Sequence, residues 1–253
     1  TIYQNAYVRT DSFFDNSPLA SSGLPSKEEL ELLDVWKDQI PSEVFTETFT
    51  PPTTDGSGND RKNLLKAKEI LEKEGWIVEN GKLFKDGQEF KFEFLIVSPS
   101  DEKIALAYQS NLKKLGITMD VRTVDSSQYQ ERLLSYDFDM IKRYWGVSLS
   151  PGNEQQFYWG SEVGKKDGSR NYPGIDSPAV DALIEKLINA SNRQELTTAI
   201  HALDRVLLWG HYVVPLYHSN KDRIAYWDFF EYPDEIPLYG IVIESWWINK
   251  DKQ

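Results

Sequence analysis

The hydrophobic pattern is clearest from residue 60 onward, where helical and strand spacings alternate. A helix over 62–75 is predicted by apolar residues three and four positions apart, namely Leu64, Leu65, Ala67, Ile70 and Leu71. Gly75 is expected to end this helix, because glycine readily adopts the left-handed backbone found at helix C-termini. The dipeptides Asn80-Gly81 and Asp86-Gly87 favour tight hairpin turns, so residues 77–97 are predicted to form a meander.

Strands and helices then alternate through residues 92–145. Phe90, Phe92, Phe94 and Ile96 fall on one face of a strand, and a helix over 101–115 follows with Ile104, Tyr108, Leu112 and Leu115 on one stripe. A second strand from Ile117, a helix near 126–135 and a third strand near 138–145 complete the alternation. This order implies a sheet with right-handed crossovers. We therefore expect adjoining strands covered by the 101–115 helix, with Phe92, Ile104 and Leu112 buried.

The flanking regions carry helix signals of other kinds. Ser26 and Glu29 are spaced as a capping box, in which the serine and the glutamate satisfy each other's backbone amides. Ser177-Pro178 marks the start of a later helix, and Ser191 or Asn192 caps a further one that runs to Gly210. Between and after these helices we expect a loop over 50–59, a loop carrying 157–159, a strand over 213–217, and a turn-rich aromatic segment over 222–253.

Charge and composition narrow the classes of partner. The 253 residues carry a formal net charge of -12, which repels phosphate backbones, so no nucleic-acid partner is expected. Cysteine is absent, which excludes disulfides and thiolate zinc sites. No apolar run has the length that a membrane span requires. The chain has no visible signal peptide and begins Thr1-Ile2, which we interpret as the interior of a longer protein.

Motifs for catalysis or cofactor binding are missing from the sequence. The three histidines, His201, His211 and His218, do not have metal-ligand spacing, and Gly56-Ser57-Gly58 lacks the lysine of a phosphate-binding loop. We therefore expect no metal, no cofactor and no enzymatic activity. A carbohydrate-active enzyme with an aromatic groove remains an alternative, because acidic residues are plentiful and a glycosidase needs only two. A stand-alone interaction domain whose aromatic tail docks a partner is a third.

Aromatic residues cluster at predicted strand ends and in loops. The candidate binding residues are Tyr144 and Trp145 at the end of the third strand, Tyr158 and Trp159 in the loop that follows, and Tyr217 and His218 after a later strand. Ligands of open α/β sheets bind beyond the carboxyl ends of the strands. Aromatic rings at that place suit peptides or sugars, although packing between two lobes would explain the same rings.

Several strings resemble the peptide-binding branch of the family 5 solute-binding proteins associated with microcin C and murein-peptide uptake. In chain order the similar segments are 14–26 (FDNSPLASSGLPS), 55–58 (DGSG), 172–181 (YPGIDSPAVD), 209–215 (WGHYVVP) and 223–227 (RIAYW). Together they are spread over nearly the whole chain.

The resemblance implies an α/β fold, specifically the C-terminal lobe of a class II periplasmic binding protein, with a mixed sheet flanked by helices. Residues 1–216 would form this second lobe of a two-lobed clamp, and 217–253 a tail that returns toward a first lobe outside this chain. The tail residues Tyr239, Ile241, Ile243, Trp246 and Trp247 resemble a segment that packs on the first lobe. In this chain we therefore expect the tail to fold onto its own lobe or to pair with another copy. The implied function is capture of peptides in the periplasm and delivery to the permease subunits of an ABC importer in the inner membrane.

Ser148 departs from the pattern of oligopeptide-binding relatives. Those proteins carry an aspartate shortly after the strand-end tryptophan, and it pairs with the free α-amine of the peptide. Ser148 stands at the corresponding position after Trp145. A buried ammonium without a carboxylate partner is costly. The resemblance, with this departure, therefore favours cargo with a blocked or atypical amino end, or a murein-derived peptide.

Overall fold

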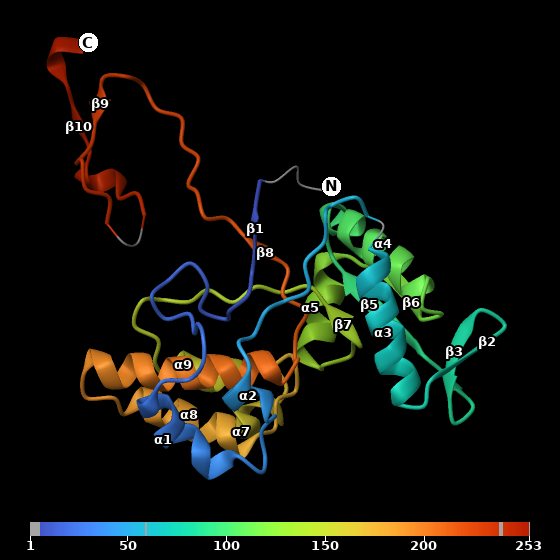
Figure 1. Ribbon diagram of the computed structural model, residues 1–253. Helices are drawn as coiled ribbons and strands as arrows, with labels where there is room; N and C mark the ends of the chain where they lie inside the picture. Colours follow the sequence, from blue (N-terminus) through green and yellow to red (C-terminus); the bar gives the residue numbers. More distant parts are fainter. Residues whose placement is uncertain (1–5, 59, 238–239, 253) are drawn as a thin grey trace.

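The computed structural model describes residues 6–58, 60–237 and 240–252, which form an α/β unit, a helical unit and an extended tail (Figure 1). The α/β unit spans residues 61–141. The helical unit contains the segments 12–46 and 154–209, so the chain enters it twice. The tail, of which residues 219–237 and 240–252 are described, runs away from both units in Figure 1. Two predicted positions, Asn59 in the expected loop and Tyr239, lie outside the described residues.

The α/β unit opens with helix α3 (Arg61–Lys73) and a small antiparallel meander. Its strands are β2 (Ile77–Glu79), β3 (Lys82–Lys85) and β4 (Gln88–Glu89). Both connecting turns have two consecutive residues of positive φ, 49° and 81° at Asn80-Gly81 and 52° and 77° at Asp86-Gly87. Such turns match the twist of a hairpin. The predicted helix is confirmed, and so is the meander over 77–89. The meander was expected to continue to residue 97, but residues 91–96 form a strand of a separate parallel sheet.

A three-stranded parallel sheet forms the centre of this unit, in the order β6-β5-β7. Its strands are β5 (Lys91–Ile96), β6 (Thr118–Thr123) and β7 (Met140–Ile141), and its helices are α4 (Pro99–Lys113) and α5 (Ser126–Leu134). The predicted alternation is confirmed. The third strand, however, is much shorter than the expected 138–145, because the chain turns toward the helical unit after Ile141.

Of the three residues predicted to be buried in the α/β core, only Leu112 is buried. Phe94, Ile96 and Leu112 are buried in one cluster with Leu83 and Met119. Phe92 packs against that cluster but is only partly buried, and Ile104 on α4 is also only partly buried, so the prediction was wrong for both. A sheet of three strands, one of them two residues long, is too narrow to cover the whole apolar face of α4.

The helical unit packs around α8 (Pro178–Ile188) and α9 (Arg193–Trp209), with α1 (Lys27–Leu33), α2 (Glu43–Thr46), α6 (Glu154–Trp159) and α7 (Ser161–Gly164) against them. A 3₁₀ turn, η1 (Asp34–Trp36), extends α1. The predicted caps form: Ser177 Oγ accepts from the Val180 amide, and Asn192 Oδ1 accepts from the Glu195 amide. The apolar face of each long helix is buried, which includes Val180, Leu183, Ile184, Leu187, Ile200, Leu203 and Leu207.

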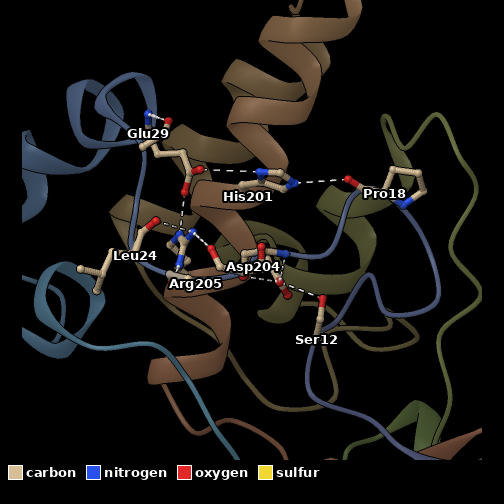
Figure 2. Close-up of polar contacts among 11 residues, drawn as sticks. Ser12, Pro18, Leu24, Glu29, His201, Asp204 and Arg205 are labelled. Carbon is tan, nitrogen blue, oxygen red and sulfur yellow. Dashed lines mark hydrogen bonds and ion pairs between the residues drawn. The ribbon is translucent and has the colours of Figure 1, made fainter.

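Within the helical unit, charged side chains of α9 hold the segment 12–24 against that helix (Figure 2). Arg205 Nε lies 2.6 Å from Glu29 Oε2, and both residues are buried. The other guanidinium nitrogens donate to the carbonyls of Ser22, Gly23 and Leu24. The capping box is therefore only half formed. Ser26 Oγ accepts from the Glu29 amide at 3.2 Å, but the Glu29 carboxylate turns inward to α9.

Asp204 is the second buried charge on α9, and it is fully enclosed. Its carboxylate accepts from Ser12 Oγ at 2.8 Å, the Phe13 amide at 2.8 Å, and the Ser21 amide and hydroxyl at 2.9 and 2.7 Å. Burial raises the pKa of Asp204, while the hydrogen bonds from Ser21, Ser12 and Phe13 act in the opposite direction. Because buried carboxylates are costly unless fully hydrogen-bonded, these four bonds fix where residues 12–21 can lie.

A two-stranded ladder joins the beginning of the described chain to its return from α9. Strand β1 (Val8–Arg9) pairs antiparallel with β8 (Tyr217–His218). The predicted strand over 213–217 was thus wrong except at Tyr217. Pro215 has no amide hydrogen to donate to a ladder, which disfavours a regular strand before it.

The tail carries its own small pairing and many exposed rings. Strands β9 (Phe230–Glu231) and β10 (Trp247–Ile248) are antiparallel, and short 3₁₀ turns η2 (Ile243–Ser245) and η3 (Lys250–Lys252) accompany β10. Trp227 is 73% exposed and Ile243 is 67% exposed. We expected the tail to fold onto its own lobe or to pair with another copy. The first alternative was wrong, since the tail stands away from both units in Figure 1, and the second stays a prediction.

Candidate functional site

The candidate site begins where the chain leaves the parallel sheet. Strand β7 ends at Ile141, and residues 142–153 lead to α6 in the helical unit. The parallel strands β5, β6 and β7 have their carboxyl ends at the same edge of the sheet. This edge is where open α/β sheets bind ligands.

Two basic residues immediately after β7 are engaged within the chain. Lys142 Nζ bonds to Asp101 Oδ1 at the start of α4 and lies 5.9 Å from the centroid of the Tyr217 ring. Burial lowers the pKa of Lys142, but the bond to Asp101 and its charge outweigh this effect and leave the pKa above its ordinary value. Arg143 stacks over Tyr172 at 4.9 Å and donates to its hydroxyl at 3.2 Å. These contacts connect the strand end to β8 and to the helical unit.

Tyr144 and Trp145 follow, and they differ in exposure. Tyr144 is 89% exposed. Trp145 is partly buried, because it packs against the core of the helical unit with its ring 4.9 Å from that of Trp159 and inclined by 43°. Its indole Nε1 is shielded from solvent and has no acceptor among the described residues. Trp145 is therefore a ring with one supported side and part of its surface open.

Tyr158 and Trp159 lie in helix α6 rather than in the loop that we expected, so that assignment was wrong. The turn before α6 is held by the Glu154 carboxylate, which accepts from the Gly152 amide at 2.9 Å. Both rings turn inward: Tyr158 is 9% and Trp159 2% exposed. Their contacts belong to the core of the helical unit, and Trp159 lies directly beneath Trp145.

Ser148 occupies an exposed turn between Trp145 and α6. Its hydroxyl accepts from the Ser150 amide at 3.1 Å, and the residues around it are mostly exposed as well. The chain therefore has a hydroxyl, and no carboxylate, at position 148.

Tyr217 and His218 form β8. The Tyr217 ring lies 4.7 Å from that of Tyr7. His218 Nδ1 lies 3.2 Å from Thr10 Oγ1 and 3.4 Å from Asp15 Oδ2. Through Lys142, the structure brings Tyr217 to the strand end that also carries Tyr144 and Trp145.

The contacts divide the seven candidate residues into layers. Tyr144, Trp145 and Ser148 lie on the connecting segment, Tyr217 and His218 on the adjacent ladder, and Tyr158 and Trp159 beneath. The sequence did not indicate that Lys142, Gln155 and Tyr172 lie beside the candidate residues. Gln155 is 1% exposed and accepts from Trp159 Nε1 at 3.0 Å. The sequence pattern does not indicate that Gln155 is buried, because a polar residue in a short helix is expected to face solvent.

No group of three or more His, Cys, Asp or Glu side chains is placed to hold a metal ion among residues 6–58, 60–237 and 240–252. Within the same ranges, every helix is too short or too polar to cross a membrane.

Comparison with known proteins gives consistent similarities. A family model for bacterial extracellular solute-binding proteins, family 5 Middle, matches residues 1–167. In Agrobacterium fabrum, the probable peptide-binding protein YejA is 43% identical over 99% of this chain and 41% of its own length. The peptidoglycan-binding protein YepA of the same organism is 40% identical over 97% of this chain and 40% of its own length.

A solved structure agrees in fold. The oligopeptide-binding protein AppA of Bacillus subtilis, in complex with a nonapeptide, superposes with a TM-score of 0.57 at 22% identity. The match covers 88% of this chain and 45% of AppA. The chain thus spans about 40% of the length of the two curated relatives, and its α/β architecture with flanking helices is the one expected from its sequence.

Proposed function

The chain belongs to family 5 of the bacterial extracellular solute-binding proteins, and we propose that it is the second lobe of a peptide-binding protein that serves an ABC importer. In this proposal residues 1–216 form one jaw of a clamp, and a first lobe outside this chain forms the other. Binding shifts a population of open and closed states toward the closed one. The activity is capture and release of cargo, and no catalytic step is involved.

The observation that carries the proposal is Trp145. It stands just beyond the carboxyl end of the parallel sheet, supported from beneath by Trp159 and partly open on the other side. A preorganised ring of this kind suits stacking against a peptide or its side chains. We propose Tyr144, Ser148, Tyr217 and His218 as the neighbouring surface, with Tyr158 and Trp159 as its support.

The partners and the compartment follow from the same proposal. The cargo is a peptide, the downstream partners are the permease subunits of an importer in the inner membrane, and the protein acts in the periplasm. The relative YejA is named as a probable peptide-binding protein, and the relative YepA as a peptidoglycan-binding protein. The first name supports peptide cargo, and the second supports cargo derived from murein.

The tail over 217–253, which begins with β8, is proposed to return to the first lobe. Its exposed apolar side chains support this assignment, since such patches on single chains usually mark contact surfaces. Those on the described part include Trp227, Ile236, Ile243 and Trp247.

Replacing Trp145 with alanine in a version extended to the length of its relatives is expected to weaken peptide binding by about 1–3 kcal/mol, the range for a buried aromatic anchor. Isothermal titration calorimetry with a panel of short peptides and murein peptides measures this change. Trp76→Ala is the matched control, because Trp76 is also partly buried but packs against Phe90 in the α/β unit. Equal affinities of the Trp145 variant and the parent protein would exclude Trp145 as a cargo contact.

Replacing Ser148 with aspartate is expected to favour peptides with a free amino terminus. A carboxylate beside a bound ammonium is worth roughly tenfold or more in affinity when the pair is shielded from water. The measurement is the ratio of dissociation constants for a free peptide and its N-formyl counterpart, before and after the substitution. Ser150→Asp, two residues along the same exposed turn, controls for the added charge. A ratio that does not move would show that Ser148 does not face the amino end of the cargo.

A further inference from the structure

A continuous line of contacts runs from the buried interior of the helical unit to Trp145. Trp159 is at its centre, 2% exposed, with Trp145 at 4.9 Å on one side. On another side the Phe13 ring meets it edge to face, at 5.0 Å and 81°. Packed interiors transmit displacement because they contain few voids. A rotation of Trp159 would therefore change the surface on which Trp145 rests, and with it the angle between the two rings.

Gln155 fixes the rotation of the Trp159 ring. Both residues lie in α6, four positions apart, and Gln155 Oε1 accepts from Trp159 Nε1 at 3.0 Å. Gln155 is 1% exposed, which is unusual for an amide side chain, and its Nε2 donates to Glu154 Oε1 at 3.3 Å. Burying an amide is costly unless it is hydrogen-bonded. The bond to Trp159 offsets that cost and ties the indole plane to the helix backbone.

The backbone of Phe13 is attached to helix α9. Its backbone amide donates to Asp204 Oδ1 at 2.8 Å, so the loop that carries it is attached to α9. Trp159 thus also rests on a ring whose backbone is held by a fully buried carboxylate.

We propose that Gln155 and Trp159 are positioning residues for Trp145, which hold its ring at the inclination required to stack on cargo. This inference rests on the proposed function, in which Trp145 contacts the peptide. The residues themselves do not touch the cargo, because both are buried. Ligand-contacting groups need supporting residues that lock their orientation, and a glutamine bond to a neighbouring indole supplies such a lock.

Ordinary core packing is the competing explanation, and the two differ in what a Gln155 substitution changes. If Gln155 merely fills space, a side chain of equal volume preserves the Trp145–Trp159 geometry. If it is a positioning residue, losing its oxygen lets Trp159 rotate, and the inclination of 43° between the two indoles is lost.

The first test uses this chain and circular dichroism. Two indoles at 4.9 Å give an exciton couplet in the far ultraviolet, and Trp145→Phe identifies it by difference. Gln155→Met, of similar volume without an amide, is expected to lower the couplet by half or more, and Gln155→Asn to lower it because its amide no longer reaches. The double variant Glu154→Gln with Gln155→Glu keeps both an acceptor for Trp159 and an amide–carboxylate contact between positions 154 and 155, and it is expected to retain the couplet. Leu133→Ala, in a separate cluster, controls for lost stability and should leave the couplet intact.

The second test measures peptide affinity in the version extended to the length of its relatives. Gln155→Met is expected to weaken binding about three- to tenfold, and the double variant Glu154→Gln with Gln155→Glu to keep most of the parent affinity. An unchanged couplet in Gln155→Met would overturn the inference, as would a lost couplet with unchanged affinity. If the extended protein binds no peptide at all, the proposed function fails, while the couplet still decides whether Gln155 orients the tryptophan pair.

Discussion

Replacing Glu29 with alanine is expected to lower the free energy of unfolding by about 3–5 kcal/mol, because it leaves the Arg205 guanidinium buried without its partner. The two charges are 2.6 Å apart, and both side chains are at most 6% exposed. Urea denaturation followed by far-ultraviolet circular dichroism measures the change. The double variant Glu29→Leu with Arg205→Met is expected to recover part of the loss, since replacing both charges removes the desolvation cost as well as the attraction.

An exposed ion pair on the same unit provides the control. Glu162 and Lys165 are 2.8 Å apart, but their side chains are 82% and 56% exposed. Glu162→Ala should leave the free energy of unfolding almost unchanged, because water and salt screen such pairs. Equal effects of the two single substitutions would contradict the importance given to the buried pair.

The pH dependence of the Glu29 effect has a defined sign. Burial by itself raises the pKa of Glu29, but the hydrogen bonds from His201 and Arg205 and their charges outweigh it and leave the pKa lowered. A carboxylate with a lowered pKa in the native state stabilises that state above its unfolded pKa, and loses this contribution as the pH falls through the native pKa. The difference between the parent chain and Glu29→Ala should thus shrink as the pH falls below about 4.5. The part that comes from protonated His201, whose pKa the bond to Glu29 raises, should shrink as the pH rises above about 6.5.

Replacing Asp204 with alanine is expected to cost a similar amount, about 3–5 kcal/mol, since hydroxyl and amide donors would be left buried without an acceptor. Those donors come from Ser12, Phe13 and Ser21. Asp204→Asn keeps one acceptor oxygen and should lose less. The measurement is again urea denaturation, combined with limited proteolysis of segment 12–24, which should be cleaved faster in the alanine variant. A loss below about 1 kcal/mol would show that the donors find other partners.

The consequences of the Asp204 variant extend to the candidate site. Phe13 would lose its attachment to α9, and it packs against Trp159 beneath Trp145. The tryptophan couplet should therefore weaken in Asp204→Ala even under conditions where the chain remains folded. A weaker couplet would show that the buried hydrogen bonds of Asp204 influence Trp145 without contacting it.

Local signals in the sequence determined much of the architecture. Asn80-Gly81 and Asp86-Gly87 produce hairpin turns because these residues tolerate positive φ, wherever the hairpin is placed in the molecule. The stripes on α8 and α9 and their caps at Ser177 and Asn192 likewise lie within a few residues of one another. Such features depend on backbone geometry and on amphipathic spacing, so a reading of neighbouring residues finds them.

Tertiary contacts decided the rest, because the partners are far apart along the chain. Glu29 reads as a capping residue, yet its carboxylate binds Arg205, which is 176 positions away. Asp204 accepts from Ser12 across 192 positions. The same applies to the candidate site. The sequence places aromatic residues near a strand end, but it does not indicate that Trp159 faces inward onto Phe13 while Tyr144 faces solvent. Neighbouring residues set helices and turns, whereas the orientation of a side chain depends on which distant surface excludes water from it.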